Sequence, residues 1–366
     1  MRVGLGLFAV PLLVSYACGG ASTPPPNGQV QPIGDPLATP ADQSVVAVSA
    51  SAAASASAPG PAASAAPTGA PSSGGATVLA KELHAPNAVA FDKTNVYWVD
   101  EIDGDLARMP KRGGTVMTVY GGTGQAFGAN SSIAIDDTDV YWTSQIDKAS
   151  SLTRQDKNGG KPTVVTSSTV AVIECVAIDD AAMYWVLGGG IVKESKKGGA
   201  PQALGGGFKG ADCIAVDGDH VYWSLSGTPE KQFADGGIVE ASKTGANQRM
   251  LVKGADHAAN VKADGQAVYW QSGPKVFKSD KAKGEAVKLA EASGPVADIA
   301  IDDRFVYFLT PDAVARVPKD GGRGETLVDH LEAPSSVAVD ATGVYFTTKG
   351  TEAAKWRDGT LQRVDK

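Results

Sequence analysis

Five side chains with carboxylate or amide oxygens stand just before copies of a recurring aspartate in this sequence. Each lies four or five residues ahead of one copy, and the five are Asn87, Glu174, Asp212, Asn260 and Asp298. Oxygen ligands of this kind are those that Ca²⁺ prefers in proteins. The sequence therefore raises a calcium site as one hypothesis and a water-filled opening lined by the same residues as the other.

The three cysteines suggest two further kinds of chemistry. Cys175 and Cys213 occupy matching positions in neighbouring repeats. An even pair of cysteines in an exported protein can form a disulfide if the two Cβ atoms point toward each other, and the sequence leaves this bridge open. Cys18 follows a short apolar run near the start of the chain, which makes it a candidate for lipidation.

Catalytic motifs are scarce. The chain has no Gly-x-Ser-x-Gly, His-Glu-x-x-His or Cys-x-x-Cys pattern. Residues 205–210 match Gly-x-Gly-x-x-Gly by letter, but no strand–turn–helix unit surrounds them, so we expect a simple loop. The formal net charge of -7 gives no electrostatic reason to bind nucleic acid. These features favour a protein that binds rather than one that catalyses.

The recurring aspartate belongs to a unit that is repeated seven times. Each unit reads small residue, Val or Ile, Ala, apolar residue, Asp, then a turn and Val-Tyr-Trp or a close variant. The seven aspartates are Asp92, Asp136, Asp179, Asp217, Asp264, Asp302 and Asp340. Seven of the 9 tyrosines and five of the 6 tryptophans fall in this unit. Alternating apolar residues at this repeat length, with short turns, predict four antiparallel strands per unit.

Seven such units predict an all-β fold, a seven-bladed β-propeller over residues 76–366. The chain ends after the third strand of the last unit, so residues 76–84 are expected to supply its fourth strand and close the ring. The Tyr-Trp unit resembles the repeats of YWTD propellers and those of NHL and TolB-like bacterial propellers. It departs from the YWTD family in having seven units instead of six.

Strand order predicts one face, the top face, that carries the longer connections. It should hold the loops from each fourth strand to the next blade and the loops between second and third strands. Four aromatic residues and three histidines outside the repeat register fall there: Phe127, Phe208, Phe233, Trp356, His84, His257 and His330. Aromatic rings beside polar groups are typical of binding surfaces. We therefore expect this face to bind a protein, peptide or glycan.

The resemblance to propellers also implies an alternative, an enzyme. Some hydrolases, lactonases and lyases with this fold use a divalent cation at the channel mouth. In this chain the five oxygen-bearing residues would hold the ion, and His84 or His330 would act as the base.

The N-terminal 75 residues predict export rather than a folded core. Residues 1–17 have the basic start and short apolar run of a signal peptide, and residues 18–75 are rich in Ala, Ser, Pro and Gly, as in a disordered tether. The segment before Cys18 resembles a bacterial lipobox, with Ser15 in place of the usual Leu. This implies an outer-membrane lipoprotein facing the periplasm or the cell surface, attached only by its lipid and monomeric. The alternative is a secreted protein cleaved after Ala17.

Overall fold

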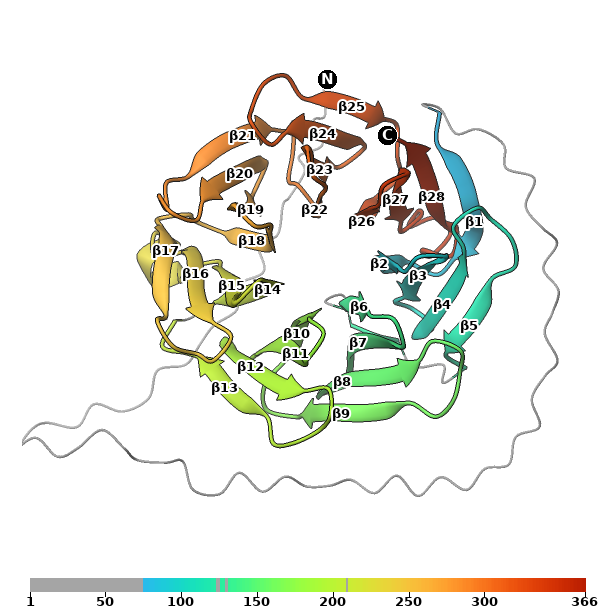
Figure 1. The fold of residues 1–366 in the computed structure, drawn as a ribbon. Helices are drawn as coiled ribbons and strands as arrows, with labels where there is room; N and C mark the ends of the chain where they lie inside the picture. The colour runs from blue at the N-terminus through green and yellow to red at the C-terminus, as the bar shows by residue number, and fades with distance from the viewer. Residues whose placement is uncertain (1–74, 123–125, 129–130, 209) are drawn as a thin grey trace, which may run out of the picture. The chain divides into compact units, whose positions relative to one another are not determined.

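A computed structural model describes residues 75–366 apart from 123–125, 129–130 and 209, so Cys18 and the predicted signal peptide lie outside the described residues. The described chain forms seven antiparallel sheets of four strands, arranged as a ring (Figure 1). This is a seven-bladed β-propeller, which confirms the fold predicted from the repeats. The one helical element of the described segments is the 3-10 turn Pro229–Lys231, and none of these segments forms a helix that could cross a bilayer.

The blades are numbered in chain order, and each runs from an inner strand at the axis to an outer strand at the rim (Figure 1). The inner strands are β2 (Pro86–Phe91), β6 (Ile133–Ile135), β10 (Ile173–Ile178), β14 (Ala211–Asp217), β18 (Ala258–Ala263), β22 (Ile299–Ile301) and β26 (Pro334–Val339). The second strands are β3 (Asn95–Asp100), β7 (Asp139–Ile146), β11 (Ala182–Leu187), β15 (His220–Leu225), β19 (Ala267–Ser272), β23 (Phe305–Leu309) and β27 (Gly343–Thr348). The third strands are β4 (Asp105–Pro110), β8 (Ala149–Asp156), β12 (Gly190–Ser195), β16 (Gly237–Ser242), β20 (Lys275–Asp280), β24 (Val314–Pro318) and β28 (Gly359–Asp365). The outer strands are β5 (Met117–Tyr120), β9 (Thr163–Ser168), β13 (Gln202–Gly205), β17 (Arg249–Lys253), β21 (Val287–Glu291), β25 (Glu325–Val328) and β1 (Thr77–Leu83).

The ring closes through β1, which forms the outer strand of blade 7. It pairs antiparallel with β28, with Val78 opposite Gln362 and Leu83 opposite Gly359. The side chains of Leu79 and Leu83 are 5% and 7% exposed and pack in one cluster with Trp98 of blade 1. The predicted closure by the N-terminal strand is therefore confirmed.

The Val-Tyr-Trp segments build the interfaces between blades. Tyr and Trp side chains of the second strands are almost fully buried. In most seams the Tyr of one blade shares a cluster with the Trp or Phe of the next, as Tyr141 does with Trp185 and Tyr222 with Trp270. Burial of large aromatic surfaces between sheets stabilises each seam.

The recurring aspartate shapes the turn between first and second strands. In six of the seven copies, Oδ1 accepts the backbone N–H groups two and three residues further on, as in an Asx-turn, with 2.8 Å from Thr94 N to Asp92 Oδ1 as an example. In five blades the repeat Tyr donates its hydroxyl to Oδ2, with Tyr97 Oη 2.9 Å from Asp92. In blade 4, Tyr222 instead donates to Glu240.

A lysine from the following blade contacts every one of these aspartates. Each stands at the end of a third strand, and its Nζ reaches back across the seam. We call these seven ion pairs the Lys–Asp ring, and they are Lys157–Asp92, Lys196–Asp136, Lys243–Asp179, Lys281–Asp217, Lys319–Asp264, Lys366–Asp302 and Lys111–Asp340. Between Lys196 and Asp136, for example, the Nζ–Oδ2 distance is 2.7 Å. Sequence analysis did not find this ring.

Candidate functional site

The loop between β15 and β16, residues 226–236, breaks the repeat in blade 4. Thr228 donates its N–H to Asp235 Oδ1 at 2.7 Å, and its hydroxyl donates to the same carboxylate. Phe233 N–H donates to Thr228 O at 2.9 Å, which closes the segment between them into a tight turn. Gln232 and Phe233 both adopt positive φ, at 53° and 64°.

The loop between β27 and β28, residues 349–358, repeats this arrangement in blade 7. Thr351 donates its N–H to Asp358 Oδ1 at 2.7 Å and its hydroxyl to Oδ2 at 2.7 Å. Trp356 N–H donates to Thr351 O at 2.8 Å. Lys355 and Trp356 again have positive φ, at 55° and 59°. We call the two segments the aromatic loops, and their Thr–Asp pairs the clamps.

The clamps hold an unfavourable backbone. A side chain in the left-handed region costs about 1–2 kcal/mol, and each aromatic loop places two such residues in succession. The N–H of Thr228 is the main cause that lowers the pKa of Asp235, and the N–H of Thr351 does the same for Asp358. Both carboxylates therefore stay charged at neutral pH, and each keeps an aromatic residue in a conformation that the chain would otherwise avoid.

The predicted aromatic residues differ in their exposure. Trp356 is 37% exposed, and Phe233 is half-buried with its ring centroid 3.9 Å from that of His257. Phe208 packs partly buried against the cluster of blades 3 and 4. Phe127 is 2% exposed and packs with Tyr120 and the blade 1–2 core, so its ring offers no surface. The expectation of an exposed aromatic at Phe127 is corrected, because its ring packs into the core between blades 1 and 2.

The three predicted top-face histidines have different surroundings. The side chain of His257 is 53% exposed, and that of His330 is 79% exposed beside Asp329. His84 contacts Asp103 of the β3–β4 loop. Arg357 Nη1 lies 3.1 Å from His84 Nδ1, and its Nη2 lies 3.2 Å from Asp103. Arg357 therefore ties the aromatic loop of blade 7 to blade 1.

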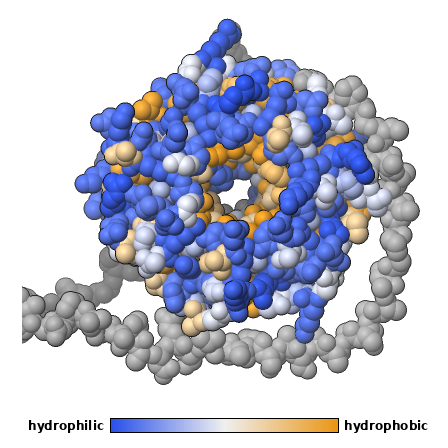
Figure 2. Space-filling model, viewed as in Figure 1, coloured by the Kyte–Doolittle hydropathy of each residue, from blue (hydrophilic) through white to orange (hydrophobic). Residues whose placement is uncertain are grey.

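The inner strands enclose a cavity of about 410 Å³ on the axis, which we call the channel cavity. In Figure 2 the ring is open at its centre, within a mostly hydrophilic face. All five predicted metal ligands line this cavity, as do Lys262 and Gln271, which sequence analysis did not select. The sequence does carry a signal for Lys262, because the other six repeats have alanine at this position.

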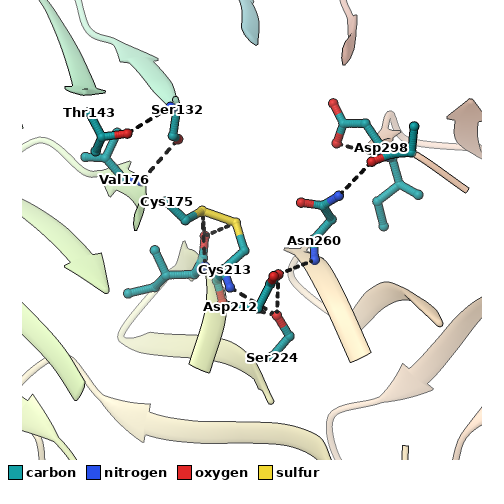
Figure 3. The surroundings of a disulfide bond; sticks show 12 residues. Ser132, Thr143, Cys175, Val176, Asp212, Cys213, Ser224, Asn260 and Asp298 are labelled. Atoms are coloured by element: carbon teal, nitrogen blue, oxygen red, sulfur yellow. Dashed lines mark hydrogen bonds between the residues drawn. A yellow bond between two sulfur atoms is a disulfide. The ribbon is translucent and has the colours of Figure 1, made fainter. Parts of the chain in front are cut away.

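The channel carboxylates hold neighbouring blades together. Asp298 accepts the N–H of Ile299 at Oδ1 and that of Val337 in blade 7 at Oδ2, at 2.8 and 3.0 Å. Asp212 accepts the N–H of Asn260 in blade 5 at 3.0 Å (Figure 3). Burial and the charge of Asp212 raise the pKa of Glu174, and burial raises that of Asp212. Within the described residues, no three His, Cys, Asp or Glu side chains are grouped to hold a metal ion; a Ca²⁺ site stays a prediction.

Cys175 and Cys213 form a disulfide between the inner strands of blades 3 and 4 (Figure 3). Their Cα atoms are 5.0 Å apart. The equivalent positions elsewhere make polar links instead: Ser132 accepts the N–H of Val176, and Ser336 that of Val89. One position of the repeat therefore serves to join adjacent inner strands by different chemistry.

Seven blades around an open axis, with irregular loops on one face, define the class of protein as a β-propeller. The chain is similar to virginiamycin B lyase from Staphylococcus aureus (TM-score 0.62, 12% identity, covering 78% of this chain and 97% of that chain). It is also similar to a puromycin-hydrolyzing peptidase from Mycobacterium tuberculosis (TM-score 0.60, 16% identity, 76% and 50% coverage). A third similar structure is PorZ, a surface component of the type-IX secretion system of Porphyromonas gingivalis (TM-score 0.54, 14% identity, 74% and 36% coverage).

Neither the protein-family models nor the curated proteins include a match to this sequence. Identities this low show a shared fold alone, and function must be argued from the sites themselves.

Proposed function

We propose that this protein is a non-catalytic binding module that captures a protein, peptide or glycan with its two aromatic loops. The observation that carries this proposal is the duplication of one strained, clamped loop in blades 4 and 7. Two separate loops place an aromatic residue at positive φ between the Thr and the Asp of the same clamp. Strain that recurs at equivalent loops is typical of functional segments, because a purely connecting loop has no need of it.

The arrangement suits recognition in physical terms. A ring that the backbone already fixes contributes contact area without losing much conformational freedom on binding. Each loop also carries charges of both signs: Lys231 pairs with Asp235 in one loop, and Arg357 of the other pairs with Asp103. A partner with exposed apolar groups therefore fits this surface best.

The catalytic alternative has less support. The oxygens of Asp298 already accept hydrogen bonds from blades 6 and 7, and Asp212 is bonded to blade 5. His84, one candidate base, is engaged by Asp103 and Arg357. If Ca²⁺ and EDTA leave the melting temperature unchanged, the metal-dependent version is rejected.

The binding proposal is tested with Phe233→Ala and Trp356→Ala. Immobilised protein is challenged with solubilised envelope proteins and cell-wall glycans from the source bacterium, and affinity for the captured partner is then measured. Each variant should weaken binding by about tenfold or more, as expected for a central aromatic contact, with an unchanged melting temperature. Val170→Ala is the matched control, since Val170 is an 88% exposed apolar residue outside the two loops. Equal capture by all variants would reject the proposal.

The clamp provides a second test of the same surface. Asp358→Ala leaves Trp356 in the chain but frees the loop backbone. Binding should fall nearly as much as with Trp356→Ala, because the ring loses its fixed position. Full binding by Asp358→Ala would show that the strained conformation is irrelevant.

We further propose that a lipid on Cys18 and the tether hold this module at the cell envelope, either in the periplasm or on the surface. The support is the sequence before Cys18 and the Ala/Ser/Pro/Gly-rich composition after it. Labelling with a fatty-acid analogue should mark the wild type and not Cys18→Ala. A wild type that stays unlabelled and is released into the medium would favour the secreted alternative.

A further inference from the structure

Blade 5 departs from the other blades inside the channel cavity. Lys262 lines the cavity two residues before the repeat aspartate. The other six blades have alanine at this position: Ala90, Ala134, Ala177, Ala215, Ala300 and Ala338. Within the described part of the chain, Lys262 forms no ion pair or side-chain hydrogen bond, although it lies near enough to Asp212 to lower that residue's pKa. The repeat fold therefore does not require this ammonium group.

A second departure from the repeat is Gln271 on β19, the strand that pairs with the strand of Lys262. Gln271 is 9% exposed and lines the same cavity, and its Oε1 is buried without a hydrogen-bond partner in the described structure. Most blades have an apolar residue or Thr here, including Val99, Thr143, Val186, Leu309 and Thr347. A buried amide oxygen without a donor is unfavourable, so its presence at a cavity wall indicates a group that is supplied from outside.

The wall formed by blades 3 and 4 carries the opposite charge. Glu174 accepts no hydrogen bond from the described residues, and Asp212 accepts its hydrogen bonds from Ser224 and Asn260 at Oδ2 alone. The pKa of Glu174 is raised by burial and by the charge of Asp212. Two carboxylates that repel each other at a cavity wall are relieved by a bound cationic group.

We propose that the channel cavity binds a small zwitterion, a molecule of dipeptide size with an ammonium group and a carboxylate. The ammonium group contacts Glu174 and Asp212, the carboxylate contacts Lys262, and an N–H of the ligand donates to Gln271 Oε1. The cavity of about 410 Å³ lies within the usual range for small-molecule sites. This site is separate from the aromatic loops and does not depend on the function proposed for them.

The lining argues against other ligand classes. None of its residues is aromatic, so a sugar ring would lack the stacking partner that usually covers its apolar face. A simple anion would meet Glu174 and Asp212, and a simple cation would leave Lys262 unused. A ligand that carries both charges therefore matches this lining best.

The test uses isothermal titration calorimetry on the propeller chain with four probes: glycylglycine, its N-acetyl derivative, glycylglycinamide and glucose. Glycylglycine should bind saturably with a Kd on the order of 1 mM or tighter. The acetylated probe lacks the ammonium group and the amide lacks the carboxylate, so each should bind at least tenfold more weakly. Lys262→Ala should reduce glycylglycine binding to the level of the amide while leaving the amide unaffected. Glu174→Gln should likewise reduce glycylglycine binding to the level of the acetylated probe, while leaving the binding of the acetylated probe unaffected.

The variants Lys262→Ala and Gln271→Thr restore residues that other blades contain, so they should fold. Without ligand the melting temperature of Gln271→Thr should equal or exceed that of the wild type, because Gln271 Oε1 has no hydrogen-bond donor within the described residues. Lys253→Ala, at an exposed lysine of the outer strand β17, should change neither binding nor melting. The proposal is overturned if no probe binds saturably, if glucose binds more tightly than glycylglycine, or if Lys262→Ala weakens the amide equally. A lower melting temperature for Gln271→Thr would equally overturn it, since it would give Gln271 a purely structural role.

Discussion

Replacing Lys319 with Met should weaken the seam between blades 5 and 6 by about 1 kcal/mol. Burial alone would raise the pKa of Asp264, but the Lys319 ammonium and the N–H groups of Gln266 and Ala267 outweigh it and lower this pKa from 3.8 to about 2. A shift of this size corresponds to about 2.4 kcal/mol at most. Since the Asp264 side chain is 29% exposed and Lys319 is one of several partners, we expect less than half of that value from this pair.

The assay is urea unfolding at pH 7 in a double-mutant cycle with Lys319→Met, Asp264→Asn and the double variant. The coupling energy should be about 1 kcal/mol. The control is the same cycle on Lys93 and Asp137. Their side chains are 88% and 89% exposed, and Lys93 Nζ lies 3.5 Å from Asp137 Oδ1, so the coupling energy should be close to zero. If the two cycles give the same coupling energy, the reasoning about the Lys–Asp ring is refuted.

The Lys–Asp ring also sets the direction in which the free energy of unfolding changes with pH. Burial opposes the shift in each case, yet hydrogen bonds from lysine and turn N–H groups lower the pKa of Asp179, Asp302 and Asp340 to about 2 as well. The folded-state pKa lies below the unfolded value, so this stabilisation is present above about pH 4 and is lost as the pH falls toward 2. Lys319→Met should make that loss shallower. Stability that rises on acidification through this range would contradict the assignment.

Three further perturbations test the rest of the structure. Leu79→Ala or Leu83→Ala should each cost about 3 kcal/mol in urea unfolding, because both residues fill the closing seam; a loss below about 1 kcal/mol would mean that β1 is dispensable. Replacing both Cys175 and Cys213 with Ser should cost about 2–4 kcal/mol, measured the same way, and unchanged stability would show that the bridge adds nothing to the ring. Burial raises the pKa of Asp100 to about 7, so the wild type should lose stability as the pH rises from about 4 to about 7. Asp100→Asn should therefore melt higher than the wild type at pH 8, and this advantage should shrink as the pH falls and disappear at about pH 3; equal melting temperatures at pH 8 would refute this.

The fold could be predicted because its determinants repeat at one register. The spacing from the aspartate to Val-Tyr-Trp is nearly constant, and these residues make both the turn and the seams. The Lys–Asp ring was not predicted, because the number of residues between the aspartate and the lysine of a repeat varies with the length of the loop between the second and third strands. Lys196 follows Asp179 closely, whereas Lys243 is separated from Asp217 by an aromatic loop. A lysine just after each third strand was the available signal.

The candidate site was predicted only in part. Phe233 and Trp356 were selected because their loops are long, yet both loops also share Gly-Thr at the start and Asp-Gly at the end, a pattern visible in the sequence. Phe127 could not be separated from them, because exposure depends on how a loop folds back and not on its length. The cavity residue Gln271 could not be found either, since its importance lies in a missing hydrogen-bond donor, which only coordinates reveal.

The pairing of β1 with β28 has a consequence for folding kinetics. Leu83 meets Gly359, so the final sheet waits for a contact across about 280 residues of sequence. Blades 1 to 6 can each assemble from contiguous chain, whereas blade 7 cannot begin its last hydrogen-bond ladder until β28 has been synthesised. A circular permutant opened between two other blades, with β28 joined to β1 by a short linker, would convert this slow long-range step into a local hairpin and should refold faster.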